Sequence, residues 1–316
     1  AVFVLCFGLA FGYLYTHQDK IKQIITNNLN AQLNTQVSVG GIEIDFFSKF
    51  PEVSIKFTNV RADEALPKSE QSLFLFKGIF VRFGIWDLLG EDYTVRKLSF
   101  DDGELNLRIT PDGKVNFIFW KENEDDGSAA PTTIALENVE FNNAKLRYLD
   151  EDIDLRLIVF INHLEITGGY QAAVFESTIS GKGILADLTF EDYDLADSLS
   201  IATHGSLTNQ HGSTKINIKE LLLQDVAFTG SGELRENTQR WKLSSKDTRL
   251  HQWLRIIPKA WQPNIDLAAI GGEADAQFDI SLDDDKQEVL ATAKLKDAAL
   301  NLEEKHILLQ NANGEI

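Results

Sequence analysis

Histidines are the residues of this sequence whose chemistry is easiest to test by spacing. The six histidines are scattered, and no two of them stand four residues apart, as two metal ligands on one helix face would. The nearest pair, His204 and His211, lies seven residues apart in a stretch rich in Gly, Ser and Asn. We interpret this pair as solvated loop residues, so the histidines predict no metal site.

Glycine-rich and acidic stretches also lack the spacing that chemistry needs. "SGKGI" and "GSGEL" do not continue into a phosphate-binding loop, and neither opens a helix. The acidic runs at 123–126 and 283–285 have no Gly or distal Glu at the spacing of a calcium loop. Asp192 and Asp194 lie in a polar turn, and no Gly-x-Ser-x-Gly elbow is present. The sequence therefore predicts that the chain is not an enzyme and uses no cofactor.

Composition limits the class of partner. The chain has 48 acidic and 30 basic residues and a net charge of -18, so it would repel the phosphates of a nucleic acid. Its 316 residues are 43% apolar, which is enough to bury a core. Cys6 is the one cysteine, which excludes an internal disulfide but leaves the redox compartment open.

The N-terminal segment predicts a membrane anchor. Residues 1–15, "AVFVLCFGLAFGYLY", carry no charge, whereas a spanning helix needs about 20 apolar residues. We expect a truncated transmembrane helix, with a signal-peptide core as the alternative. A lipoprotein signal fits less well, because Val4 and Leu5 precede Cys6. Residues 16–36 predict an amphipathic juxtamembrane helix that either covers the end of the next domain or lies on the membrane surface.

From Val37 onward apolar residues alternate with polar ones, which is typical of strands. The pattern divides into a β region at 37–120, an acidic loop or linker at 121–133, and further strands at 134–316. One short helix is expected near 250–257, where Pro258 ends it. The fold class is therefore mainly β: an elongated, twisted antiparallel β-sheet groove built from repeats, with an N-terminal transmembrane helix and a few short helices.

A recurring frame supports the repeats. It reads apolar-x-apolar-x-Asp/Asn-small-x-apolar-x-apolar, begins at residues 98, 139 and 293, and has a looser copy at 221. The first two copies are 41 residues apart, and the later steps are close to twice that. We interpret Asp102 with Gly103 as a tight turn between two strands, and "TPDGK" as the next turn, with Gly113 free to adopt a positive φ.

A sheet with one apolar face must be covered by something. The two expected helices are too little for this many strands, so a closed barrel, a sandwich and an open trough for an apolar ligand remain. Repetition along one axis favours the trough.

The segment "VRKLSFDDGELNLRITPDGKVNF", residues 95–117, resembles the most recognisable segment of the AsmA family. There a Val/Ile-Arg-x-Leu strand, a Gly-Glu/Pro-x-Leu-x-Leu strand and an Asp-Gly-x-x-Asn-aromatic turn follow in this order. "FFSKFPEVSIKFTNV" upstream is similar to the family's entry strand, and "LENVEFNNAKLRYLD" to a later repeat. The resemblance is specific over residues 42–120.

The resemblance implies a protein anchored in the bacterial inner membrane by one helix, with the bulk of its chain in the periplasm. Its β-groove would shield phospholipid acyl chains between the inner and outer membranes, with outer-membrane or periplasmic proteins as further candidate partners. A non-catalytic β-rich scaffold for envelope assembly is the alternative, and a hydrolase with a dispersed site is a weaker one. The family has no catalytic or metal residues to carry over. The candidate groove lining consists of the apolar positions of the frames: Leu98, Phe100, Leu105, Leu107, Val139, Phe141, Leu146, Tyr148, Leu221, Leu223, Leu295 and Leu300.

Overall fold

The structure is a computed structural model of the 316-residue chain. It describes residues 35–45, 52–66, 71–84, 95–117, 137–171, 174–210, 212–235, 238–258, 269–283, 286–302 and 307–315. The predicted anchor at 1–15, the predicted helix at 16–36 except its last two residues, and the predicted loop at 121–133 lie outside these residues.

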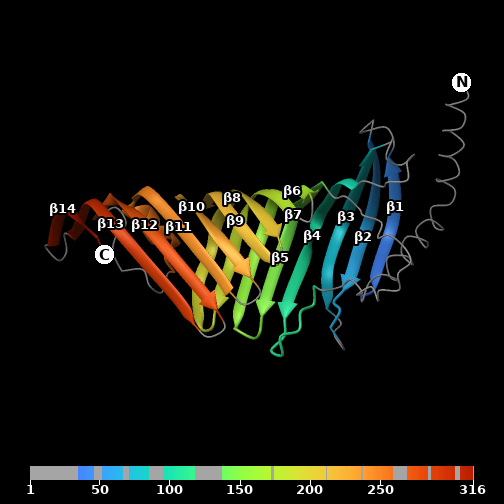
Figure 1. Cartoon of the computed structure of the whole chain (residues 1–316), viewed down its shortest axis with the longest axis horizontal. Helices are drawn as coiled ribbons and strands as arrows, with labels where there is room; N and C mark the ends of the chain where they lie inside the picture. The colour runs from blue at the N-terminus through green and yellow to red at the C-terminus, as the bar shows by residue number, and fades with distance from the viewer. Residues whose placement is uncertain are drawn as a thin grey trace, which may run out of the picture. The chain divides into compact units, whose positions relative to one another are not determined.

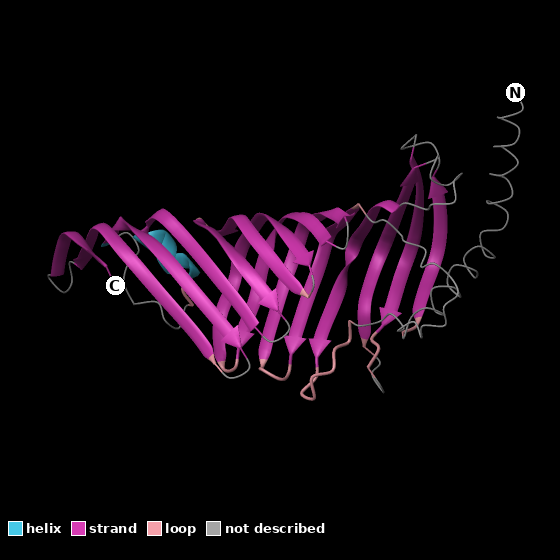
Figure 2. Ribbon diagram, viewed as in Figure 1, coloured by secondary structure: helices cyan, strands magenta, loops and turns pink. Residues whose placement is uncertain are grey.

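The described chain is mainly β, as the alternation predicted (Figures 1 and 2). Its first strand begins at Val37, where the alternation begins. The strands follow one another in the sheet in chain order: β1 (Val37–Asp45), β2 (Glu52–Asp63), β3 (Ser72–Gly84), β4 (Val95–Ile109), β5 (Asn138–Asp150), β6 (Leu155–Gln171), β7 (Val174–Phe190), β8 (Tyr193–Gln210), β9 (Ser213–Leu223), β10 (Val226–Arg235), β11 (Thr238–Arg249), β12 (Ile270–Asp283), β13 (Gln287–Leu302) and β14 (Ile307–Glu315).

The chain divides into two compact units, each described here by itself. Unit 1 comprises Ala1–Leu136 with Asn142–Asp152, and unit 2 comprises Glu137–Phe141 with Ile153–Ile316. In unit 1, β1 to β4 pair in antiparallel fashion. In unit 2, β6 to β14 do the same.

The neighbours β4 and β5 depart from the antiparallel expectation. Asn142 donates a hydrogen bond of 2.9 Å to Asp101, and Asn143 donates one of 3.4 Å to Asp102. Further along, the guanidinium of Arg147 lies 3.5 Å from the side chain of Asn106. Residue numbers therefore rise together on the two strands, so β5 runs parallel to β4 there. Parallel neighbours need a crossover connection rather than a hairpin.

This parallel alignment explains the spacing of 41 residues, which does not measure a repeating unit. The side-chain bonds join residues of β4 to residues 41 positions later in β5. The next interval, between the frames at 139 and 221, runs from β5 to β9 and spans four strand steps instead of one. The 41-residue period is thus wrong as a structural period, because strand number does not scale with it.

The predicted turn at Asp102–Gly103 is also wrong. β4 continues through it from Val95 to Ile109, and β3 stays paired on both sides, with Gly78 opposite Asp101 and Phe76 opposite Gly103. Asp102 does adopt the left-handed backbone that was expected, with φ 54. Asp and Asn tolerate this conformation both in turns and where an extended strand bends, so the residue type alone does not decide between them.

Bends of this kind recur within the strands. Strand residues with positive φ include Asn59, Asn143, Ser198, Asp247, Asp297 and Asn311. Two of these, Asn143 and Asp297, belong to frames that predicted turns, whereas the looser copy does form a hairpin turn at 224–225 between β9 and β10. The predicted turn at "TPDGK" is confirmed, because Gly113 has φ 74 and donates its N–H to Thr110 O at 2.9 Å.

Each unit has one apolar side, called here its apolar face, and one polar side. In unit 1, the apolar face carries Val39, Val60 and Phe76 in one cross-strand row, all buried. The opposite side carries Glu43, Lys56 and Ser99. Side chains alternate along a strand, and a bend at a residue with positive φ, such as Asn59, shifts the parity, so that most apolar groups stay on one side.

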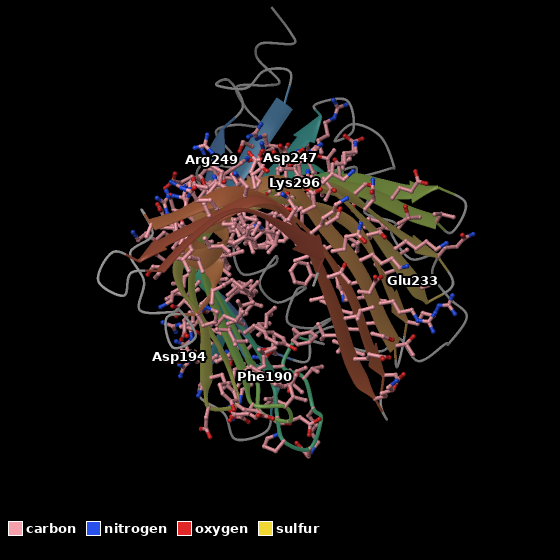
Figure 3. The ribbon with its side chains drawn as sticks, turned by 90° about the vertical axis from the view of Figure 1, so that its left-hand side faces the viewer. Phe190, Asp194, Glu233, Asp247, Arg249 and Lys296 are labelled. Carbon is pink, nitrogen blue, oxygen red and sulfur yellow. The ribbon has the colours of Figure 1, made fainter. Side chains whose placement is uncertain are left out.

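Unit 2 repeats this division over more strands. Its apolar face is crossed by a row running from β6 to β12 through Ile166, Ile179, Gly205, Ile218, Gly230, Leu243 and Phe278. The adjacent residues form a polar row on the other side: Thr167, Thr178, Ser206, Asn217, Ser231, Lys242 and Asp279. The strands of this unit bend into an arch, and Glu233, Asp247 and Lys296 lie on its outer side (Figure 3).

The predicted helix near 250 is confirmed as α3 (Leu250–Ile256). It lies against β10, β11 and β12 (Figure 2). The side chain of Trp253 packs on two rings of the sheet, with centroids 5.6 Å from Phe228 and 6.2 Å from Phe278. Since Phe278 belongs to the apolar face, α3 covers part of that face rather than an open end of the sheet.

Candidate functional site

The described residues contain no group of three or more His, Cys, Asp or Glu side chains that could hold a metal ion. Among the same residues, no helix has the length and apolar character needed to cross a bilayer. The feature that calls for a functional explanation is the apolar face.

All twelve predicted lining residues share one property. Each is half-buried, being neither enclosed in a core nor freely exposed. Core residues such as Val60 and Phe76 in unit 1, with 4% and 1% of their surface exposed, differ clearly from them. A half-buried apolar side chain keeps part of its surface available for a further apolar contact.

In unit 1, β3 and β4 bring the first predicted residues together. Leu98 pairs with Val81, Phe100 with Ile79, and Leu105 with Phe74. The ring of Phe76 lies 5.2 Å from that of Phe100 and 6.0 Å from that of Phe74. The residues before and after the bend at Asp102 thus share one face, although their numbers change from even to odd.

The parallel alignment of β4 and β5 places two further pairs at equivalent positions. Leu146 lies level with Leu105, and Tyr148 with Leu107, by the same offset as the Asp102–Asn143 hydrogen bond. Arg147, between them, reaches Glu104 on the polar side, with 3.4 Å between guanidinium and carboxylate. Leu146 and Tyr148 therefore belong to the apolar face of unit 1.

Tyr148 combines this apolar setting with a polar contact. Its hydroxyl donates a hydrogen bond of 3.2 Å to the carboxylate of Asp150. Partial burial, and then the negative charge of Asp150, raise the pKa of the Tyr148 phenol above 10.0. The phenol thus stays neutral at physiological pH and adds no charge to the apolar face.

The remaining predicted residues belong to unit 2, where Val139 and Phe141 lie on β5. Leu221 and Leu223 pair with Phe228 and Val226 across the β9–β10 hairpin. On β13, Leu295 and Leu300 flank the bend at Asp297, and they pair with Ala274 and Ile270 of β12. Leu221 is thereby next to Phe228, the ring on which Trp253 of α3 packs.

The sequence prediction missed much of the face in unit 2, including Ile166, Ile179 and Leu243. Alternation along β7 could have found Ile179, since its neighbours Thr178 and Ser180 are exposed. No such pattern predicts which rings Trp253 packs on, because Phe228 and Phe278 belong to β10 and β12, outside the helical segment itself.

A buried polar cluster lies in unit 1 beside the "TPDGK" turn. Asn116, 1% exposed, donates hydrogen bonds to Glu64 at 3.0 Å and to the Asn106 carbonyl at 2.9 Å, and accepts one from the Arg108 N–H at 2.8 Å. The Arg108 guanidinium lies 3.7 Å from Glu64 and 2.9 Å from Glu151. The Asn of the Asp-Gly-x-x-Asn-aromatic turn thus holds the chain after the turn against β4 and against Glu64, the residue that follows β2.

Fold and site define this chain as a mainly β protein whose sheet presents a half-buried apolar face. Comparison with models of known protein families, with curated proteins and with solved structures finds no match.

Proposed function

We propose that this chain is a membrane-anchored periplasmic lipid-binding and lipid-transfer protein of the AsmA type. Its apolar face would form the floor of a β-groove that shields phospholipid acyl chains between the inner and outer membranes. The N-terminal segment would be a single transmembrane helix in the inner membrane. The protein would work without catalysis, cofactor or metal.

One observation carries the proposal: all twelve predicted lining residues, in unit 1 and in unit 2, are half-buried, and within the described residues α3 covers only part of the apolar face of unit 2. Transfer of an acyl chain onto such a face would release about 0.8 kcal/mol for each CH₂ group removed from water. Headgroups would stay hydrated at the rim, as an amphipathic ligand requires.

The test is mass spectrometry of lipids that co-purify with the chain. We expect the double variant Leu107→Asp, Leu146→Asp to lose most of the bound lipid, because two carboxylates on the floor would have to lose their water against acyl chains. Leu75→Asp is the matched control, since Leu75 is 43% exposed and pairs with Arg61 and Glu104 on the polar side. Circular dichroism establishes that each variant folds.

Photo-crosslinking in cells tests the same proposal without a destabilising charge. A photoreactive residue at Leu146 should form lipid adducts, and one at Leu75 should not. Protein adducts alone at Leu146 would favour the alternative, a β-rich scaffold for envelope assembly whose apolar face packs against another protein. Equal lipid content in the aspartate double variant and the wild type would refute the groove lining.

A further inference from the structure

A second candidate site lies on the polar side of unit 2, away from the apolar face. It is a shallow hollow of about 500 Å³ over β8 to β11. Two cross-strand rows line it: Thr208, Lys215, Glu233 and Arg240 in one, and Ser206, Asn217, Ser231 and Lys242 in the other. Neighbouring strands are about 4.8 Å apart, so these side chains converge on one small area.

The hollow is locally cationic in a chain whose net charge is -18. Lys215, Arg240 and Lys242 line it together with one carboxylate, that of Glu233, and Asp279 lies beside Lys242 on the next strand. This carboxylate is held by Arg235, whose guanidinium donates hydrogen bonds of 3.1 and 2.8 Å, and by the Ser213 hydroxyl at 3.3 Å. The hydrogen bonds from Arg235 lower the pKa of Glu233, so the carboxylate is charged but already engaged.

The donors of the hollow are unused among the described residues. Arg240 and Lys215 make no hydrogen bond or salt bridge there, although the charge of Lys215 acts on Glu233, and Lys242 has only Asp279, at 3.4 Å. The side chains of Ser206, Thr208, Asn217 and Ser231 likewise have no hydrogen-bond partner within the described part of the chain. Each can donate to a bound oxyanion.

A comparable hollow in unit 1 shows the difference. It measures about 490 Å³ and is lined by three arginines, Arg61, Arg108 and Arg147. Each of these guanidinium groups already has a carboxylate within 3.4 Å, on Asp63, Glu151 and Glu104 respectively. The arginines of unit 1 are thus satisfied within the protein, whereas Arg240 is not.

We propose that the hollow around Arg240 binds a phosphate group, carried either by a small phosphate ester or by the headgroup of an anionic phospholipid. A guanidinium holds two phosphate oxygens at once, and an ammonium adds a point charge. Hydroxyl and amide donors complete the coordination of a group with several acceptor oxygens. This site is separate from the proposed acyl-chain face, so each can fail without the other.

Titration calorimetry at low ionic strength tests the site with three probes. Glycerol 1-phosphate presents the free ester, dihexanoyl phosphatidylglycerol presents an anionic headgroup, and dihexanoyl phosphatidylcholine is the zwitterionic control. We expect Arg240→Gln to weaken binding of at least one anionic probe by about tenfold or more, since a bidentate charged contact is lost. Added salt should weaken the same binding, because the site is exposed.

Lys182→Gln is the matched control, because Lys182 is exposed on β7 outside the hollow and its removal changes the net charge equally. The affinity of Lys182→Gln for the anionic probes should stay within about twofold of that of the wild type. If Arg240→Gln loses binding of glycerol 1-phosphate, the ligand is a small ester. If it loses binding of the phosphatidylglycerol probe alone, the ligand is a headgroup. The proposal is overturned if no anionic probe depends on Arg240, or if Lys182→Gln weakens binding equally. Lipid adducts at a photoreactive residue at Leu146 should be unchanged in Arg240→Gln, which separates this test from that of the apolar face.

Discussion

At the scale of single residues, Asn116 illustrates how one side chain can satisfy several buried groups. Its side chain donates hydrogen bonds to the Glu64 carboxylate and to the Asn106 carbonyl, and it accepts one from the Arg108 N–H. The Glu64 side chain is only 1% exposed, so water cannot replace a lost partner. The turn motif therefore contributes to the stability of unit 1 through the side chain of Asn116.

Asn116→Ala should accordingly lower the free energy of unfolding by about 2–4 kcal/mol, since it leaves buried polar groups without partners. Urea unfolding followed by circular dichroism measures this. Lys114→Ala, in the same turn, removes only an exposed ion pair with Asp112 and should cost less than about 0.5 kcal/mol. Equal stability of Asn116→Ala and the wild type would show that the cluster is not a source of stability.

At the scale of the element, the bent strand is the unit on which the apolar face depends. In β4 the bend at Asp102 lets Phe100 and Leu105 share a face despite their opposite parity. Gly103, next to the bend, has no room for a side chain, because an added Cβ would lie 2.2 Å from Leu75 O and 2.4 Å from the Phe76 ring. The absence of a side chain at Gly103 therefore permits the close approach of β3.

Gly103→Ala is expected to destabilise the chain by about 1–3 kcal/mol, because β3 must move to admit the methyl group. Gly169→Ala, in β6, is the same substitution where nothing lies within 4 Å, and it should be neutral or stabilise by up to about 1 kcal/mol. Thermal unfolding of the two variants gives the comparison. A Gly103→Ala variant as stable as Gly169→Ala would mean that β3 and β4 are not held this closely.

At the scale of the whole molecule, each strand is bonded to its neighbours in chain order. The stability of such a sheet is a sum of contributions from neighbouring strands, so a destabilising substitution should affect mainly the strands around it. The division into two compact units strengthens that expectation.

Val60→Asp places a carboxylate at a position only 4% exposed in unit 1 and should speed amide hydrogen exchange throughout β1 to β4. Protection in β7 and β8 of unit 2 should persist. Hydrogen exchange read by mass spectrometry distinguishes the two regions, with Leu75→Asp as the exposed control in unit 1. A uniform loss of protection in both units would show that the chain unfolds as one cooperative body.

The sequence by itself determined the class of secondary structure, the start of β1 at Val37, the helix near 250 and the positive φ at Asp102 and Gly113. These properties follow from side-chain periodicity and from the local backbone preferences of Asp, Asn and Gly, which neighbours in sequence suffice to fix.

Only the tertiary structure decided whether a left-handed residue bends a strand or reverses it. The local conformation is similar in the two cases, and continued pairing with the partner strand makes the difference at Asp102. The tertiary structure alone likewise decided three other features. These are the parallel course of β4 and β5, the packing of Trp253 on Phe228, and the proximity of Lys215 to Arg240. Each joins residues that lie far apart in sequence, and no periodicity along the chain encodes which strands become neighbours.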